Sequence, residues 1–418
     1  MRKLTVENFS VIKEAKLEFG KITVLIGPQS SGKSLLCKLA YFLGREAIKI
    51  AVDMAVHRLP FAEFKSAVEK EFTKWFPRGG WGTDDWTIRF VEDGYDVAIS
   101  CIVDTLLPPK AVFTPAPSFE ASYNAQLKEA DETMREKGFL LAPAIQSRAA
   151  TRFFRIAGRG VWDASTYIPT QRSYFVDTKK GYRALAAEAD PISAQFADVF
   201  ANGLQPTSPG SRVQSFLGGM IVSIQNEWMM AFDDGRHLSL SDLSSGSKET
   251  LPILTSLDYY ETQRGQSGHL PSAELYGEKL YSFDDFTIEE PESSVFPQTQ
   301  YQLVQELASL GNQTSFIPHF TITTHSPYIL TSFNNLIEAG QIAKTRPELK
   351  GEVAKIVPEQ YWLKEGDFKA YAIEDGKLIS ILNESGFVEG NYLDQVSETI
   401  GDEFDRLIKL EYDHAKAS

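Results

Sequence analysis

Cysteine is nearly absent from this sequence. Cys37 and Cys101 are the only two among 418 residues, which excludes the disulfide framework that holds many small secreted domains together. The opening MRKLTVENFSV lacks the apolar core of a signal peptide, and no segment approaches the ~18 consecutive apolar residues of a membrane helix. We therefore expect a soluble protein of the reducing cytoplasm, with no membrane partner.

Basic residues are also in deficit. The chain has 42 Lys and Arg against 56 Asp and Glu, a net charge of −14, which argues against a surface that wraps nucleic acid. One local exception is a stripe of arginines spaced 4, 3 and 4 residues apart, on one face of any helix there: Arg148, Arg152, Arg155 and Arg159. This arginine stripe indicates either a nucleic-acid contact or a solvated, acid-paired helix face.

Internal repeats, low-complexity tracts and sustained heptads are missing too, which excludes a solenoid and long coiled-coil arms. The chain has instead an alternation of strands, loops and helices. Residues 22–26 form a fully apolar strand that leads into a glycine-rich loop and then a helix with apolar spacing over 35–43. Similar apolar strands recur at 286–288 and 320–324. This pattern predicts an α/β nucleotide-binding fold.

The remaining segments have weaker patterns. WTIRFVEDGYDVAISCIV predicts a β-hairpin that turns at Asp93-Gly94, and the pattern is mostly helical over about 118–160 and 180–230. The tail from 361 to 418 is acidic, and we expect a hairpin around Asp375-Gly376 and an amphipathic helix around 391–412.

The first chemical motif is the glycine-rich loop, which fits G-x-x-x-x-G-K-S. Its residues are Gly27, Pro28, Gln29, Ser30, Ser31, Gly32, Lys33 and Ser34. Backbone N–H groups of such a loop and of the following helix N-terminus bind phosphate. Lys33 then reaches the β- and γ-phosphates, and the Ser34 hydroxyl binds Mg²⁺. On this loop alone, a small-molecule kinase remains an alternative.

The second motif is the apolar strand that ends in Glu289-Glu290-Pro291-Glu292. Paired carboxylates beside a phosphate loop are what a nucleoside triphosphatase needs. We expect Glu289 to hold Mg²⁺ through water and Glu290 to act as general base on the attacking water.

Two further motifs complete the set. Leu243-Ser244-Ser245-Gly246-Ser247-Lys248-Glu249 precedes an apolar helix, so it forms either a second anion site or simply an N-cap. His325, in T-T-H-S-P, ends the last apolar strand, where it could reach a γ-phosphate or be structural.

In this order the four motifs resemble the ATP-binding-cassette (ABC) ATPases. Three features resemble the RecF, SMC and overcoming-lysogenization-defect (OLD) branch rather than transporters. They are N-F-S…I-x-x-A-x-L-x-F before the loop, E-E-P-E at the strand end, and T-T-H-S-P-Y-I-L after the last strand. The resemblance spans residues 1–45 and about 165–335. It implies a mostly parallel central sheet, an antiparallel β subdomain and a helical lobe that carries the signature motif.

The resemblance also implies how the chain divides. Residues 1–175 would form the first part of lobe I, with an inserted β/helical region at about 60–160. Residues 176–275 would form the helical lobe II with the signature. Residues 276–345 would complete lobe I, and 346–418 would be an acidic C-terminal extension.

In the family that the sequence resembles, two heads sandwich two ATP molecules. The resemblance places Lys33, Ser34, Glu289, Glu290 and His325 in cis, and Ser244, Ser245 and Gly246 on the γ-phosphate in trans. It matches Gln171, in I-P-T-Q-R-S, to a glutamine that senses Mg²⁺ and water, although Gln171 could equally be a surface residue. Ser293 and Ser294 fall where a dimer-crossing loop follows the catalytic glutamate.

Three positions depart from the family pattern. Gln29-Ser30 replaces Asn-Gly, Ser245 replaces a glycine and Glu289 replaces an aspartate, so we expect slow hydrolysis. Without coiled-coil arms, and without the D-x-D of a Toprim nuclease domain after His325, the chain looks like a bare head.

Such heads resemble the ATPases of prokaryotic defence systems, where a separate nuclease or toxin is the effector. We therefore expect an oligomeric sensor ATPase of antiviral defence. The alternatives are a RecF-like DNA-repair ATPase that binds DNA through the arginine stripe, and a scaffold that binds ATP without hydrolysing it.

Overall fold

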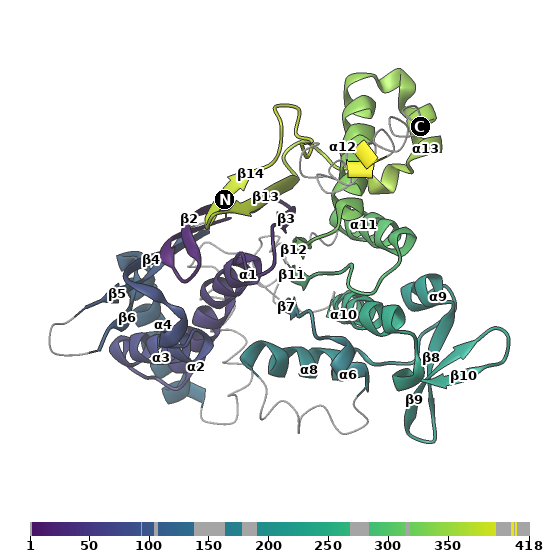
Figure 1. The fold of residues 1–418 in the computed structure, drawn as a ribbon. Helices are drawn as coiled ribbons and strands as arrows, with labels where there is room; N and C mark the ends of the chain where they lie inside the picture. Colours follow the sequence, from purple (N-terminus) through teal and green to yellow (C-terminus); the bar gives the residue numbers. More distant parts are fainter. Residues whose placement is uncertain are drawn as a thin grey trace.

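In this computed structural model, two β-sheets and the helices around them make up the described part of the chain (Figure 1). The described residues are 2–92, 94–103, 108–137, 164–177, 190–267, 284–313, 318–389, 403–404 and 406–407. Among them, eleven strands form one large sheet in the order β6-β5-β4-β1-β2-β14-β13-β3-β12-β11-β7, and three form a small sheet, β10-β9-β8. The fold is α/β, as the sequence predicts.

One half of the large sheet is parallel. Its strands, in sheet order, are β13 (Phe368–Glu374), β3 (Ile22–Ile26), β12 (His319–Thr324), β11 (Asp284–Glu289) and β7 (Ala164–Ile168). β3 is the run Ile-Thr-Val-Leu-Ile, and it lies between two parallel neighbours with both faces covered, which explains why its sequence is almost entirely apolar. The apolar strands predicted at 22–26, 286–288 and 320–324 are confirmed.

The other half is antiparallel. Its strands, in sheet order, are β2 (Ile12–Glu18), β1 (Arg2–Phe9), β4 (Gly82–Glu92), β5 (Tyr95–Ile102) and β6 (Lys110–Pro115). β4 and β5 form the hairpin that the sequence predicts around Gly94. β14 (Lys377–Ser380) joins the two halves, because it pairs antiparallel with β13 and parallel with β2.

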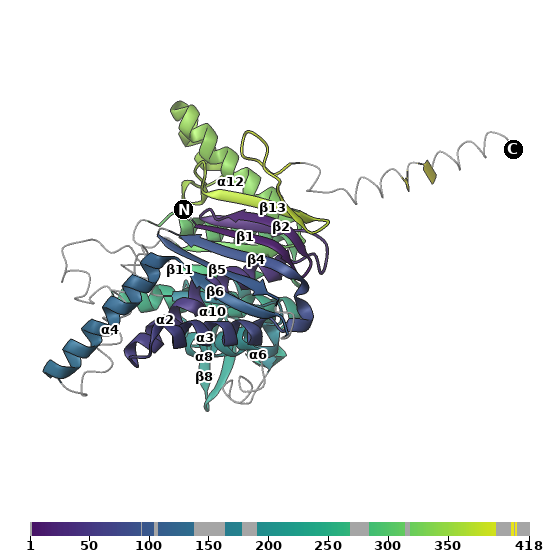
Figure 2. The ribbon, with the colours of Figure 1, turned by 90° about the vertical axis from the view of Figure 1, so that its left-hand side faces the viewer.

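Helices from the first third of the chain cover one face of the antiparallel half (Figure 2). They are α2 (Ala47–Val56), α3 (Phe61–Trp75) and α4 (Pro117–Lys137). Aromatic rings fill this contact: the ring of Phe9 lies 4.9 Å from that of Trp86 and 6.0 Å from that of Phe72, between centroids. The strands of the region predicted as an insertion, at about 60–160, are therefore part of the large sheet.

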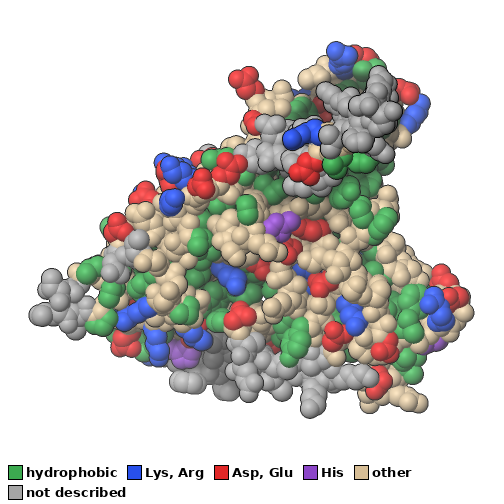
Figure 3. Space-filling model, in the orientation of Figure 1, with side chains coloured by type: hydrophobic (Ala, Val, Ile, Leu, Met, Phe, Trp, Pro, Cys, Tyr) green, Lys and Arg blue, Asp and Glu red, His purple; other side chains and the backbone are tan. Residues whose placement is uncertain are grey.

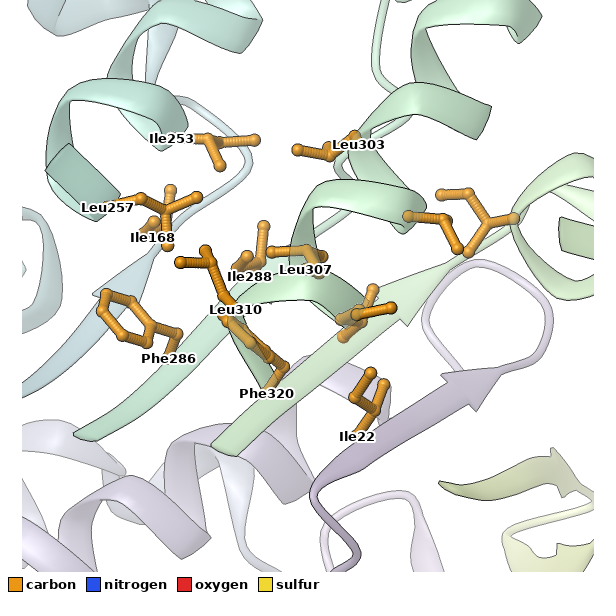
Figure 4. Close-up of a cluster of buried hydrophobic side chains, with 14 of the residues drawn as sticks. Ile22, Ile168, Ile253, Leu257, Phe286, Ile288, Leu303, Leu307, Leu310 and Phe320 are labelled. Carbon is orange, nitrogen blue, oxygen red and sulfur yellow. The ribbon is translucent and has the colours of Figure 1, made fainter. Parts of the chain in front are cut away.

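The parallel half is covered on both faces. α10 (Ser245–Ser267) and α11 (Pro297–Gly311) pack on one face, where their leucine and isoleucine side chains meet those of the strands (Figure 4). α1 (Lys33–Tyr41) packs on the other. Alternate residues of β3 belong to the two cores: Ile22 and Val24 lie on the side of α10 and α11, and Leu25 lies on the side of α1.

Residues 164–267 contain a lobe that is only partly helical. Its other helices are α6 (Ser173–Asp177), α8 (Pro191–Gly203) and α9 (Arg212–Leu217), and its small sheet consists of β8 (Gly219–Ile224), β9 (Glu227–Phe232) and β10 (His237–Ser239). The expectation of helix over about 180–230 is therefore wrong for 219–230, which lies in β8, the turn after it and β9. There Gln225 and Asn226, both at positive φ, form a two-residue hairpin turn.

The last described segments return to the large sheet. After α12 (Pro327–Thr345) and α13 (Lys350–Ile356), β13 and β14 form the hairpin predicted at Asp375-Gly376. Part of the expected acidic extension thus lies beside β3. The helix predicted around 391–412 lies outside the described residues, except for 403–404 and 406–407. None of the helices described combines the length and apolar composition needed to cross a membrane.

Candidate functional site

The parallel strands bring three of the sequence motifs to one edge of the sheet. β12 pairs with β3 on one side and with β11 on the other, with Ile26 beside Thr324 and Glu289 beside Thr323. Each strand ends at this edge. The glycine-rich loop, the Glu289-Glu290 pair and His325 follow these strand ends directly, which is where ligands bind in open α/β sheets.

The glycine-rich loop is shaped by close contacts. Gly32 has φ +108°, and a Cβ there would lie 2.5 Å from Cδ1 of Ile12, so only glycine fits. The Lys33 ammonium donates to the carbonyls of Gly27 (2.7 Å) and Pro28 (2.8 Å). The Ser31 hydroxyl oxygen is buried without a hydrogen-bond partner among the described residues. A phosphate in the loop would give that hydroxyl and Lys33 an acceptor.

The loop borders a cleft with a volume of about 550 Å³. The cleft is lined by Ser10, Val11, Gln29, Ser30, Ser31, Gly32, Lys33, Ser34, Leu35, Glu290 and His325. Burial lowers the pKa of Lys33, while the carboxylates of Glu290, Glu292 and Glu289 oppose this shift. The site therefore places a buried cation opposite acidic groups, with room between them.

Glu290 and His325 face each other across the strand ends. Their side chains approach to 3.5 Å, between Oε1 of Glu290 and Nε2 of His325, and both are about one-third exposed. Glu290 has a left-handed backbone (φ 42°), and its N–H donates to the Thr323 carbonyl (2.9 Å). The fixed backbone and accessible carboxylate suit a general base that orients a water, with His325 beside it.

Glu292, which the sequence did not assign, contacts the backbone of His325. Its carboxylate accepts a hydrogen bond from the His325 backbone N–H. Burial raises the pKa of Glu292, and this hydrogen bond opposes the shift. The third acid of E-E-P-E therefore positions the histidine segment.

Glu289 is buried and held by two donors. The Tyr167 hydroxyl donates to one carboxylate oxygen (2.6 Å), and the Thr170 N–H donates to the other (3.2 Å). Burial, reinforced by Glu289, raises the pKa of Tyr167 well above its usual range, so the phenol keeps its proton and donates. Tyr167 was not predicted, because nothing in the linear pattern links it to a residue 122 positions away.

The oxygen ligands that Ser34 and Glu289 offer suit Mg²⁺, which also takes water and phosphate ligands, better than a metal held by protein side chains alone. Within the described ranges, no group of three or more His, Cys, Asp or Glu side chains could hold a metal ion. Ser34, which lines the cleft, offers a hydroxyl, and Glu289, which ends β11 but does not line the cleft, offers a carboxylate. Each Glu289 oxygen retains a lone pair for water. Mg²⁺ accepts this kind of set, because it takes oxygen ligands and completes its shell with waters and substrate phosphates.

Arg172 is the third residue, after Glu292 and Tyr167, that the sequence analysis missed. Its guanidinium is fully buried and donates to backbone carbonyls of Pro169, Glu249, Glu289 and Glu290. It therefore joins the β7 end, the β11 end and the first turns of α10.

The signature segment lies apart from this cleft. Ser244 caps α10 by accepting from the Ser247 N–H (3.2 Å), as the simpler N-cap interpretation predicts. Ser244 and Ser245 are exposed and do not line the cleft of their own chain. Gly246 instead packs on the loop after Glu290, where a Cβ would lie 2.7 Å from the carbonyl oxygen of Ser294.

Two other predictions are not brought to the site. Gln171 is exposed beside Arg172 and does not line the cleft. The arginine stripe lies outside the described residues. On the face drawn in Figure 3, Lys and Arg side chains are interspersed with Asp and Glu.

Comparisons with known proteins find one family model and several solved structures that are similar to this chain. The AAA ATPase domain family matches residues 120–330, half of the chain, which include the signature segment, Glu289, Glu290 and His325 but not the glycine-rich loop. The structure is similar to the SMC head domain from Thermotoga maritima, with 13% identity, a TM-score of 0.34, and coverage of 91% of this chain and 98% of that one.

It is also similar to an ATP-binding cassette of an ABC transporter in its ADP conformation, with 11% identity, a TM-score of 0.36, and coverage of 95% and 96% of the two chains. No curated protein sequence matches the chain.

Proposed function

The chain belongs to the AAA ATPase domain family, and we propose from this that it binds ATP in the cleft beside the glycine-rich loop and hydrolyses it. One observation carries the proposal. The loop, Glu290 and His325 follow three different strands, and they line a single cleft.

The residues divide the work as follows. Loop N–H groups, the Ser31 hydroxyl and Lys33 bind the phosphates, with Lys33 exchanging two loop carbonyls for phosphate oxygens. Glu290 orients the attacking water and takes its proton, and His325, which lines the same cleft, would contact the γ-phosphate. Ser34 and Glu289 would hold Mg²⁺, which supplies positive charge to the phosphate oxygens.

The signature segment supports a composite site between two chains. Ser244 and Ser245 present hydroxyls and the N-terminus of α10 to solvent, away from their own cleft. A second copy could therefore receive them on its γ-phosphate. In this proposal ATP draws two heads together.

For the biological role, we propose a regulatory ATPase of antiviral defence that controls a separate nuclease or toxin by ATP-dependent assembly in the cytoplasm. The proposal rests on two resemblances: that of the four motifs to ABC ATPase heads of the RecF, SMC and OLD branch, and that of such a bare head to the ATPases of prokaryotic defence systems.

The test combines turnover with solution mass. Glu290→Gln should lower ATP turnover by about 100-fold or more, the usual range for losing a general base, while ATP still binds. Its mass by light scattering should rise when Mg-ATP is added. Lys33→Ala should abolish ATP binding. Glu352→Gln, a surface carboxylate on α13, is the matched control and should hydrolyse ATP as the wild type does.

Wild-type turnover in Glu290→Gln would remove Glu290 as the base. A mass that ATP leaves unchanged would remove the sandwich, while leaving ATP hydrolysis within one chain intact.

A further inference from the structure

Arg172 occupies an unusual position for an arginine. It follows β7 and has no exposed surface. Its Nε donates to the Glu249 carbonyl (2.8 Å), Nη1 to the carbonyls of Pro169 (3.2 Å) and Glu289 (2.7 Å), and Nη2 to the Glu290 carbonyl (2.9 Å). Oε2 of Glu249 lies 3.3 Å from Nε and forms an ion pair with it. Four of these five contacts are therefore to the backbone.

Such a group is a costly way to fill a core. Burying a charge costs several kcal/mol before any contact compensates, and an apolar side chain of similar volume often serves stability as well or better. Burial lowers the pKa of Arg172, and the acidic side chains led by Glu249 oppose the shift. What a guanidinium adds is geometry, because its rigid fork fixes several acceptors relative to one another.

The acceptors belong to two segments that the proposed reaction uses. Glu289 ends β11 and Glu290 follows it, and Glu290 carries the general base on a left-handed backbone. Glu249 lies in the second turn of α10, whose N-terminus is the signature segment. A non-glycine residue such as Glu290 keeps a left-handed backbone only when the surrounding structure fixes it. Two hydrogen bonds fix the Glu290 backbone: its N–H donates to the Thr323 carbonyl, and its carbonyl accepts from Arg172.

A second contact joins the same two segments. Gly246, in the first turn of α10, packs so closely on Ser294 that a Cβ would lie 2.7 Å from the Ser294 carbonyl oxygen. Lys248 pairs with Asp177 (2.6 Å), which ties α10 to the end of α6. A displacement of the α10 N-terminus would therefore be carried to the loop that bears Glu290.

We propose that Arg172 is a positioning residue that couples the signature end of α10 to Glu290, so that contact of the signature segment with nucleotide sets the alignment of the base. This inference rests on the proposed ATPase function. Arg172 itself does not line the cleft. Its hydrogen bond to the Glu290 carbonyl links it to a residue that does.

The test compares Arg172→Lys with Arg212→Lys. Arg212 is also a largely buried arginine that holds α10, through Asp258 and Glu261, and it pairs with Glu306 of α11, but none of these contacts reaches β11. Both substitutions keep the charge and remove the fork. Turnover, KM for ATP and the melting temperature are measured for each variant at a temperature where all are folded.

Arg172→Lys should lower kcat by about 10- to 100-fold with KM unchanged, since a misplacement of about 1 Å can cost on the order of 100-fold. Arg212→Lys should lower the melting temperature without this loss. Equal losses of kcat in both variants, in proportion to their loss of stability, would make Arg172 a structural residue only.

Hydrogen–deuterium exchange with AMP-PNP gives a readout that needs no turnover. In the wild type and in Arg212→Lys, AMP-PNP should slow exchange in 27–34, in the signature segment 244–250 and in 290–294. In Arg172→Lys it should slow exchange in 27–34 and 244–250 but not in 290–294. Protection of 290–294 in Arg172→Lys, or its absence in the wild type, would overturn the coupling and leave the ATP site standing. No protection of 27–34 in the wild type, with no turnover, would overturn the proposed function and the coupling with it.

Discussion

The hydrogen bond from Tyr167 to Glu289 can be tested by removing one oxygen atom. In Tyr167→Phe the ring stays in place, where it packs edge-on against Tyr41 at 5.6 Å between centroids. The Glu289 carboxylate loses its shorter hydrogen bond, at 2.6 Å, and keeps the longer one from the Thr170 N–H, at 3.2 Å. Glu289 is 4% exposed, so water has little access to replace the phenol.

The expected loss is large for one atom. A hydrogen bond to a charged group contributes about 1.5–3 kcal/mol, against about 1 kcal/mol for a neutral pair. We expect Tyr167→Phe to lower the free energy of unfolding by about 2 kcal/mol. The matched control is Tyr371→Phe, because the Tyr371 hydroxyl donates to a neutral carbonyl, that of Glu18, at 3.0 Å. Its loss should be about 1 kcal/mol or less.

Urea unfolding followed by tryptophan fluorescence measures both changes under one set of conditions. We expect Tyr167→Phe to lose clearly more stability than Tyr371→Phe. If the two losses are equal, or if Tyr167→Phe loses less than about 0.5 kcal/mol, the bond to Glu289 is not the charge-assisted bond that its geometry indicates.

Two more predictions follow from close packing and from burial. Gly246→Ala should destabilise the protein and lower turnover, because its Cβ would lie 2.7 Å from the Ser294 carbonyl, whereas Gly351→Ala, with nothing within 4 Å, should be neutral or stabilising in the same melting assay. Burial raises the pKa of Glu292 above its usual value of 4.5. Between that value and the raised pKa, the folded protein binds a proton that the unfolded chain has lost. The free energy of unfolding should therefore fall as pH rises from 4.5 through the raised pKa. Glu292→Gln should remove this slope in unfolding experiments run across pH, and parallel curves for the two proteins would contradict it.

The motifs that are contiguous in the chain could be predicted from the sequence. A glycine-rich loop between an apolar strand and an amphipathic helix indicates a phosphate-binding site. The structure places Lys33, Glu290 and His325 around one cleft. Their proximity follows from the parallel pairing of β3, β12 and β11, since strand ends meet at one edge.

Residues that act through distant contacts could not be predicted in this way. Arg172 reaches Glu289 across 117 positions, and its sequence neighbours give no sign that it is buried. The turn at Gln225-Asn226 lacks the glycine that usually marks a two-residue hairpin, so the sequence pattern over β8 and β9 predicts helix. The hairpin at Asp375-Gly376 was visible, but its place beside β3 depends on pairing with a strand 346 positions earlier.

This last pairing has a consequence for how the protein is made. β3, which leads into the phosphate loop, is flanked by two strands that are synthesised late: Ile26 pairs with Thr324 and with Ala372. At about 5–20 residues per second, roughly 15 to 60 s pass before the first partner strand is synthesised. Such long-range pairing is also slow to form once the chain is complete. A partly synthesised chain therefore carries the whole phosphate loop but lacks the sheet that shapes it, so nucleotide binding should begin only near the end of synthesis.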